Sequence, residues 1–170
     1  DILSDCRDFT GVYFDDIIVH SKSRALHFKH LQQIFRIFGE RGIEFNLKKC
    51  QLIKPEVNFL GHLVNEEGLK PEATKISEVV KLNAPTNVTE LRSFLGMAAF
   101  FRKFIERFSE SAAPLFALLK KGSKFFWSSE CQKGFSDIQQ KLSSPTMLVH
   151  PIFDRPFAIV CDASKHAIGF

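Results

Sequence analysis

The sequence predicts an α+β fold, and three observations support this prediction. Two short apolar runs, at 11–14 and 17–21, flank a pair of aspartates, which is the pattern of a β-hairpin. An amphipathic helix is predicted at 23–41, and the pattern after residue 71 is mainly helical. With 170 residues, of which 45% are hydrophobic and 25% charged, the chain has the composition of a globular protein with a buried core.

The first predicted helix follows the hairpin. It begins after Ser23, a residue type that caps helix N-termini, and ends before Gly42, a residue type that ends helices. Its apolar side is expected to consist of Phe28, Leu31, Phe35 and Phe38.

The region 43–69 is predicted to be β structure. Its apolar and β-branched residues fall into three runs, at 43–47, 50–53 and 57–64. A turn at 66–68 is expected to close this β region, because it combines acidic residues with a glycine.

From Pro71 onward the pattern becomes helical, and this proline suits the first position of a helix. Asn87 and Glu90 have the spacing of a capping box and open a helix that runs towards Phe104. A further helix is predicted at 113–121.

The last predicted helix is capped by Ser128 or Ser129. Its inward side is expected to consist of Cys131, Phe135, Ile138 and Leu142. Prolines then mark a loop region, after which a strand at 157–161 ends at Asp162 and opens a new β unit.

Composition excludes some classes of protein. The longest apolar run, 94–101, is far shorter than the roughly 20 residues that span a bilayer, so we expect no membrane segment. The four cysteines show no paired spacing, which argues against a zinc site or a disulfide framework and favours reduced thiols in an intracellular protein.

The charge is unevenly distributed along the chain. Residues 1–19 carry a net charge of −4, whereas 20–54 carry +6 and 91–125 carry +5. An acidic segment beside basic segments suits a metal-dependent enzyme that acts on nucleic acid, since phosphates need cations around them. Solvated helix faces explain the same charges, and on charge alone they are the better explanation.

Asp15 and Asp16 lie between the two predicted strands of the first hairpin. Neighbouring side chains of a straight strand point to opposite faces, so both carboxylates can serve one site only if the backbone turns there. Carboxylates crowded on a turn repel each other unless a cation compensates, and Mg²⁺ prefers such oxygen ligands. Because Asp is also a favoured turn residue, the pair predicts either a plain polar turn or a metal site.

Several short segments occur in one order along the chain. Tyr13-Phe14-Asp15-Asp16 resembles the YxDD hairpin of reverse transcriptases. The later segments are LKKC at 47–50, VNFLGH at 57–62, GLKP at 68–71, PTN at 85–87, ELRSFLG at 90–96, RKFI at 102–105, FW at 126–127, CQ at 131–132 and DAS at 162–164. Together they resemble the Pol polyprotein of gypsy-type LTR retrotransposons over nearly all of the chain.

This resemblance implies roles for individual residues. Asp15 and Asp16 would be two of the three polymerase carboxylates that bind a pair of Mg²⁺ ions, and Asp162 would be the first metal-binding aspartate of a ribonuclease H. The residues implied to contact nucleic acid are Tyr13, Leu60, Gly61, His62, Arg92, Arg102 and Lys103. For Gly61 a bulge without a ligand remains an alternative, and for the three basic residues simple surface solvation does.

The resemblance also implies an organisation and partners. Residues 1–70 would form the C-terminal part of a reverse-transcriptase palm with a hairpin that grips the primer, 71–122 thumb or connection helices, and 123–170 the N-terminal part of a ribonuclease H-like domain. The partners would be an RNA/DNA template-primer and dNTPs.

The third polymerase carboxylate of this family would lie upstream of Asp1, and further ribonuclease H residues would lie downstream. We therefore expect the chain to be a piece of a longer protein, an RNA-directed DNA polymerase with ribonuclease H activity, and to lack both activities by itself. The alternative is a retroelement-derived remnant that binds nucleic acid or protein without catalysis.

Overall fold

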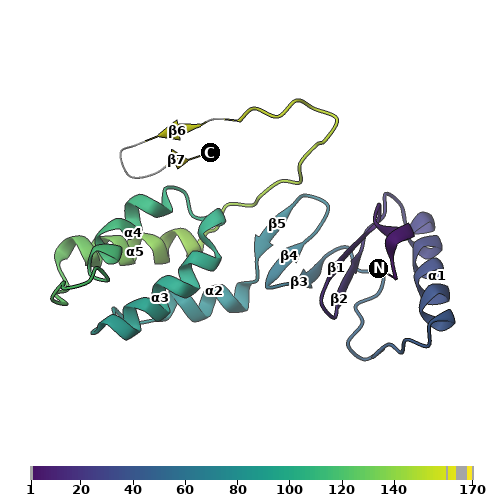
Figure 1. Ribbon diagram of the computed structural model, residues 1–170, viewed down its shortest axis with the longest axis horizontal. Helices are drawn as coiled ribbons and strands as arrows, with labels where there is room; N and C mark the ends of the chain where they lie inside the picture. The colour runs from purple at the N-terminus through teal and green to yellow at the C-terminus, as the bar shows by residue number, and fades with distance from the viewer. Residues whose placement is uncertain (1, 160, 164–167, 170) are drawn as a thin grey trace.

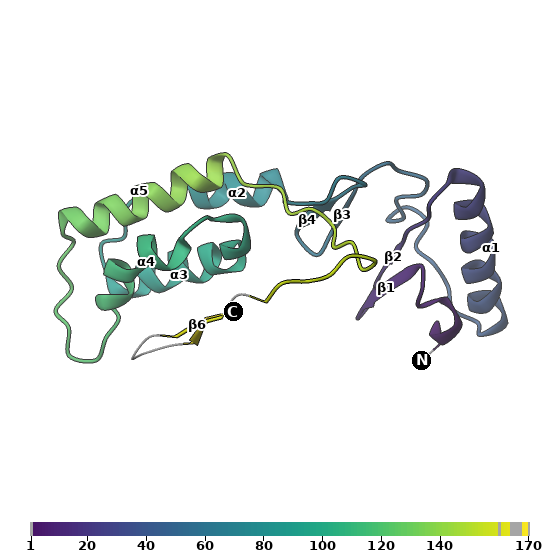
Figure 2. The ribbon, with the colours of Figure 1, turned by 90° about the horizontal axis from the view of Figure 1, so that it is seen from above.

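The structure, a computed structural model, describes residues 2–159, 161–163 and 168–169. Three parts follow one another along the long axis of the molecule: a hairpin with one helix, a small sheet, and a group of helices (Figures 1 and 2). The predicted α+β class is confirmed.

The first hairpin has a two-residue turn. Strands β1 (Thr10–Tyr13) and β2 (Asp16–Val19) pair antiparallel with Tyr13 opposite Asp16, so that Phe14 and Asp15 form the turn. The predicted hairpin is therefore confirmed, with Asp16 as the first residue of the second strand.

Helix α1 (Arg24–Glu40) packs against this hairpin, with Ser23 as the predicted cap. The Ser23 hydroxyl accepts a hydrogen bond from the backbone N–H of Leu26 at 3.2 Å. The predicted apolar side is partly wrong, because Phe28 and Phe35 are 46% and 37% exposed. The buried residues of this part are Leu3 and Cys6 of the N-terminal segment, which contains the 3₁₀-helix η1 (Ser4–Cys6), and Leu31, Ile34 and Phe38 of α1.

The strands predicted at 43–47 and 50–53 are wrong. The backbone N–H of Ile43 donates to Phe38 O at 2.9 Å, and the ring of Phe45 stacks on that of Phe38 with centroids 4.9 Å apart. These apolar residues therefore cover the end of α1 instead of joining a sheet. Ile53 adopts a left-handed backbone with φ of 55°, which an extended strand does not allow.

A small antiparallel sheet has the order β3-β4-β5, with β3 at Val57–Phe59, β4 at His62–Val64 and β5 at Leu69–Pro71. The single strand predicted at 57–64 is two strands, because Leu60 and Gly61 both have positive φ, 51° and 75°, and form a two-residue turn. Two consecutive positive φ values match the twist of a tight hairpin.

Pro71 ends strand β5 opposite His62 and is not the first residue of a helix, so that prediction is wrong. A proline is tolerated there because the end of a strand at the sheet edge does not need its N–H. Helix α2 (Ala73–Val80) begins two residues later. The turn predicted at 66–68 is confirmed, and the Asn65 Oδ1 accepts hydrogen bonds from the backbone N–H groups that follow it.

Helix α3 (Val88–Phe100) has the predicted cap at Asn87, but the Glu90 carboxylate reaches back to Thr86, the residue before the cap, and not to the Asn87 N–H of a strict capping box. The Asn87 Oδ1 accepts from Glu90 N–H at 2.9 Å, and the Glu90 carboxylate accepts from Thr86 N–H at 2.8 Å. The helix ends at Phe100, and the chain continues as the 3₁₀-helix η2 (Arg102–Phe104) instead of running helically to Phe104.

Helix α4 (Phe108–Ala117) begins five residues earlier than predicted and ends earlier, with Pro114 inside it. Helix α5 (Ser129–Ser143) is capped by Ser128, whose hydroxyl accepts from Cys131 N–H at 3.2 Å. The predicted inward residues of α5 are all buried.

Helices α2, α3, α4 and α5 share one hydrophobic core. Its fully buried side chains include Val79, Leu91, Phe94, Phe104, Leu115, Ile138 and Leu142. Helix α5 packs against both α2 and α4 (Figure 2). Between α4 and α5, the Ser111 hydroxyl donates to the Asp137 carboxylate, which also pairs with Lys141 at 2.8 Å.

The side chain of Gln139 in α5 caps the C-terminus of α2. Its amide nitrogen donates to the carbonyl oxygens of Val79, Val80 and Leu82, at 3.3, 2.9 and 2.9 Å. The carbonyls of Val79 and Val80 belong to the group that a helix end leaves without intrahelical partners, and Leu82 lies just after the helix.

Gln139→Ala should therefore lower the free energy of unfolding by about 1–2 kcal/mol, because the α2 carbonyls lose a partner that water replaces only in part. Gln140, one position later in α5, is exposed, and Gln140→Ala should change stability by less than about 0.5 kcal/mol. Urea unfolding followed by circular dichroism measures both. Equal losses in the two variants would contradict a capping role.

The strand predicted at 157–161 is also wrong for the described residues, and Val160 lies outside them. Phe157 and Ile159 are 63% and 80% exposed, and no described strand pairs with this segment to cover them. Instead, a two-residue strand β6 (Asp162–Ala163) pairs with β7 (Ile168–Gly169). Within the described residues, no helix combines the length and apolarity that crossing a bilayer needs.

Candidate functional site

The tip of the β1–β2 hairpin presents the two predicted carboxylates to solvent. Asp15 lies in the turn and Asp16 at the start of β2, and both side chains are exposed. Phe14 has φ of 49° and is 86% exposed, while its ring meets the ring of Tyr13 edge-on with centroids 4.9 Å apart. The turn thus removes the strand alternation that would point Asp15 and Asp16 to opposite faces.

Two adjacent carboxylates supply hard oxygen ligands of the kind that Mg²⁺ prefers. Their exposure leaves room for a substrate or for water on the same ion, so the residues fit part of a magnesium site. In the described part of the chain, no group of three or more Asp, Glu, His or Cys side chains could hold a metal ion. Asp15 and Asp16 therefore offer two ligands, to which others would have to be added.

A second turn lies against the helices. Gly61 at the β3–β4 turn accepts a hydrogen bond at its carbonyl from Glu72 N–H at 3.1 Å. A Cβ atom at Gly61 would lie 3.4 Å from Cε1 of Phe100, which is an ordinary contact, so the positive φ of 75° and not a lack of space favours glycine at this turn.

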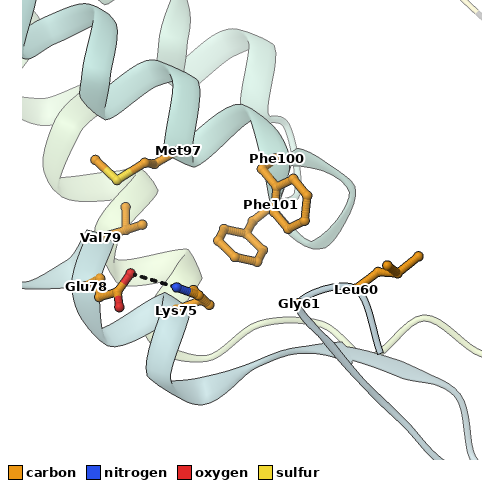
Figure 3. A pocket seen from close by; sticks show the side chains of 8 residues that line it. All are labelled: Leu60, Gly61, Lys75, Glu78, Val79, Met97, Phe100 and Phe101. Carbon is orange, nitrogen blue, oxygen red and sulfur yellow. Dashed lines mark ion pairs between the residues drawn. The ribbon is translucent and has the colours of Figure 1, made fainter. Parts of the chain in front are cut away.

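Between this turn and the helices lies a hollow of about 370 Å³ (Figure 3). It is lined by Leu60, Gly61, Lys75, Glu78, Val79, Met97, Phe100 and Phe101. Lys75 and Glu78 form an ion pair of 3.5 Å on its α2 side. The residue pattern predicted a single strand here, and only the resemblance implied a hairpin. Neither indicated the hollow, because its walls come from α2 and α3 as well as from the turn.

The ring of His62 lies between the turn and η2. Its Nδ1 donates a hydrogen bond to Leu60 O at 2.7 Å, and its ring centroid lies 5.3 Å from that of Phe100 and 5.6 Å from that of Phe104. Nε2 is buried without a hydrogen-bond partner in the described structure. Since Nδ1 carries the proton, this environment favours the neutral imidazole.

Burial lowers the pKa of His62 from its usual value of 6.5, and the nearby ammonium of Lys103 adds to this shift. As the pH falls below about 6.5, the unfolded chain therefore takes up a proton at His62 before the folded chain does. The contribution of His62 to stability is complete above this value and is lost as the pH falls towards the lowered pKa of the folded state.

We expect the urea midpoint to fall more between about pH 7.5 and about pH 5.5 in the native chain than in His62→Gln, whose amide keeps a donor but does not titrate. Other titrating groups are common to both proteins and cancel in this comparison. An equal fall in the two proteins would mean that His62 does not resist protonation in the folded state.

The predicted basic residues are all exposed but do not form one cluster. Arg102 and Lys103 belong to η2, close to the β3–β4 turn, and the Lys103 ammonium lies 5.1 Å above the ring of Phe104. Arg92 lies in the first half of α3, roughly two helical turns before Phe100.

Asp162 is the first residue of β6, in the part of the chain that follows the helices. Strand β6 lies in a different part of the molecule from the β1–β2 hairpin that carries Asp15 and Asp16 (Figure 1). Ser164, the last residue of the DAS segment, lies outside the described residues. The four cysteines are free thiols.

Two protein families match parts of the chain. Residues 1–64, a range that includes the acidic hairpin and the β3–β4 turn, match the reverse transcriptase (RNA-dependent DNA polymerase) family. Residues 127–170 match the RNase H-like domain found in reverse transcriptase, which includes α5 and β6.

Curated relatives cover nearly the whole chain. The chain is 35% identical over 159 residues to the retrovirus-related Pol polyprotein from transposon 297 of Drosophila melanogaster, which is 93% of the chain and 15% of that protein. It is also 35% identical over 157 residues to the transposon Tf2-3 polyprotein of Schizosaccharomyces pombe, which is 92% of the chain and 12% of that protein. The chain thus spans less than a fifth of the length of these relatives.

Solved structures of the foamy viral protease-reverse transcriptase share the fold. In a complex with dsDNA, the viral chain is 28% identical to this chain, with a TM-score of 0.83. The match covers 96% of this chain and 35% of the viral chain. In a complex with an RNA/DNA hybrid, the viral chain is 30% identical to this chain, with a TM-score of 0.77. The match covers 88% of this chain and 20% of the viral chain. The chain belongs to the gypsy-type retrotransposon Pol family, within the region that spans its reverse transcriptase and RNase H-like parts.

Proposed function

We propose that this chain is the part of an RNA-directed DNA polymerase with ribonuclease H activity that carries two polymerase carboxylates, a primer-gripping turn and the first ribonuclease H aspartate. Reverse transcriptases, the family to which the first part belongs, work with metal ions. The observation that carries the proposal is the β1–β2 tip, where a two-residue turn exposes Asp15 and Asp16 together.

Asp15 and Asp16 would bind Mg²⁺, which when bound would supply positive charge to the reacting phosphates. The protein's own contribution is to hold the two carboxylates next to each other at the exposed tip of a hairpin, where both can reach one ion. Tyr13, half exposed at the end of β1, would lie beside the primer terminus.

The turn at Leu60 and Gly61 would hold the primer strand, with His62 fixing the turn through Leu60 O. A glycine suits this task because backbone can approach a sugar or phosphate closely where no side chain intervenes. Arg102 and Lys103 lie near the turn and would contact phosphates, and Arg92 would do so farther along α3.

The functional division that we propose assigns 1–70 to the palm, 71–122 to the thumb or connection, and 123–170 to the ribonuclease H-like region. Asp162 would be a metal ligand of that last region. The dsDNA and RNA/DNA hybrid in the foamy viral structures support a template-primer as the partner, together with dNTPs.

The test is the binding of a labelled RNA/DNA hybrid to the whole chain, followed by fluorescence anisotropy at several salt concentrations. The double variant Arg102→Gln, Lys103→Gln should bind more weakly, and the slope of log K against log salt should fall by about 1.8, because about 0.9 counterions are released per phosphate contact.

The matched control is the double variant Lys120→Gln, Lys121→Gln, which removes the same charge from exposed residues beyond the C-terminus of α4. Its salt slope should stay close to that of the native chain. Equal losses in both double variants would show that net charge alone drives binding and would contradict a specific interface at η2.

We also expect the chain alone to extend no primer, because Asp15 and Asp16 provide only part of the carboxylate set of a polymerase. A primer-extension assay with dNTPs and Mg²⁺ measures this. Mg²⁺-dependent nucleotide incorporation by the purified chain would show that these residues suffice.

A further inference from the structure

The segment that follows α5 pairs with the edge of the small sheet. The backbone N–H of Leu69 donates to Leu148 O at 2.7 Å, and the N–H of Leu148 donates to Leu69 O at 2.9 Å. This is an antiparallel bridge between β5 and a segment almost 80 residues later in the chain. We call residues 145–150 the strap; both ribbon views show the chain passing the sheet there (Figures 1 and 2).

A second contact holds the strap two residues later. The His150 Nε2 donates to the backbone oxygen of Asn65 at 2.7 Å. The Oδ1 of Asn65 in turn accepts from the N–H groups of Glu67 and Gly68, at 3.0 and 3.1 Å. One residue of the β4–β5 turn therefore both shapes that turn and receives the strap.

Gly68 shows that the strap lies too close for any side chain. A Cβ atom at this buried glycine would overlap the carbonyl oxygen of Leu148 and lie 2.9 Å from its carbonyl carbon. The φ of Gly68 is 154°, which L-residues rarely adopt. Leu69 and Leu148 also both pack against the helical core, so the bridge is shielded from water on one side.

We propose that Asn65 and Gly68 are positioning residues, which hold the strap on β5 and so fix the part of the RNase H-like region that follows α5 relative to the turn at Leu60 and Gly61. The connection is short, because β5 pairs with β4 through Pro71 and His62, and β4 begins directly after that turn. The placement of the strap on β5 is argued from these contacts alone. Its effect on a primer held at the turn of Leu60 and Gly61 rests on the proposed function.

Hydrogen exchange of the whole chain tests the strap. In the native chain the amides of Leu69 and Leu148 should be protected, and in Gly68→Ala both should exchange at least about tenfold faster because the strap is displaced. The control is Gly96→Ala in α3, where an added Cβ meets no atom within 4 Å, and both amides should keep their native rates. Equal exchange at Leu148 in the native chain and in Gly68→Ala would overturn the proposal.

A second variant covers the case in which Gly68→Ala disturbs the turn itself. Leu148→Pro removes the N–H that donates to Leu69 O without changing the sequence of β4 or β5. Its effect is measured as the exchange rate of the Leu69 amide. Protection of amides in α3 shows in each variant that the helices remain folded. Unchanged protection of Leu69 in Leu148→Pro would likewise overturn the strap.

The effect of nucleic acid on hydrogen exchange distinguishes a positioning role from a purely structural contact. Adding an RNA/DNA hybrid should increase the protection of Leu148 in the native chain, but not in Gly68→Ala, even when that variant binds the hybrid. Binding without any change at Leu148 would overturn the positioning role. A failure to bind would overturn the proposed function, and exchange in the free chain would still decide the strap.

Discussion

Asp15→Asn or Asp16→Asn, introduced into a Pol polyprotein that contains this segment, should slow nucleotide addition by about a thousandfold. Asparagine keeps the size of the side chain but removes the negative charge that a divalent cation requires. This factor corresponds to the loss of about 4 kcal/mol of transition-state stabilisation, which we assign to one ligand of a two-metal site. Single-nucleotide primer extension at saturating dNTP measures the rate.

Asp8→Asn provides the matched control for this prediction. Asp8 is an exposed carboxylate in the same N-terminal part of the chain, before β1, and its replacement should leave the rate within about twofold of native. A native rate in both the Asp15 and Asp16 variants would remove the hairpin tip from the catalytic site. A thousandfold loss in the Asp8 variant would point instead to a general loss of charge or folding.

Gly134→Ala should lower the free energy of unfolding by about 3 kcal/mol, at the upper end of the usual cost of overpacking. Gly134 is buried where α5 crosses α4, and a Cβ atom there would overlap the backbone oxygen of Ser111 and lie 3.3 Å from Cγ of Pro114. Backbone cannot yield as a flexible side chain can, so the two helices must separate. Thermal unfolding should show a midpoint lower by about 6–12 °C.

The comparison for Gly134 is the exposed Gly96 of α3, which belongs to the same group of helices. Because a Cβ atom there meets no neighbour, Gly96→Ala should stabilise the protein by up to about 1 kcal/mol through helix propensity. The two identical substitutions are thus expected to have opposite signs. Stabilisation by Gly134→Ala would show that α4 and α5 do not cross as closely as described.

Local sequence signals were sufficient for the acidic hairpin and most of the helices. Helix caps at Ser23, Asn87 and Ser128 are short-range interactions between a side chain and a backbone N–H three residues later, so the sequence displays them directly. The two aspartates between apolar runs likewise indicated a turn, which is where the structure places Asp15.

Features that depend on how a run packs, on a single backbone angle or on distant partners were not predictable in this way. The apolar run 43–47 resembles a strand, but the structure uses Phe45 to cover α1 through its ring contact with Phe38. Gly61 indicated that the run 57–64 could bend. The run becomes two strands because Leu60 also adopts a positive φ, which the sequence did not indicate. The hollow beside Phe100 and the bridge at Leu148 leave no local pattern, because their partners lie far away in the sequence.

The shared core of α2, α3, α4 and α5 bears on how such polyproteins can be divided. The RNase H-like match starts at residue 127, yet Phe135, Ile138 and Leu142, which follow it, fill the interior of helices that precede it. A protease that cut near that border, or a recombination event that joined unrelated halves there, would leave both products with bare apolar faces. Separate expression of the halves is therefore expected to yield aggregation-prone pieces, and a viable exchange point should lie after α5.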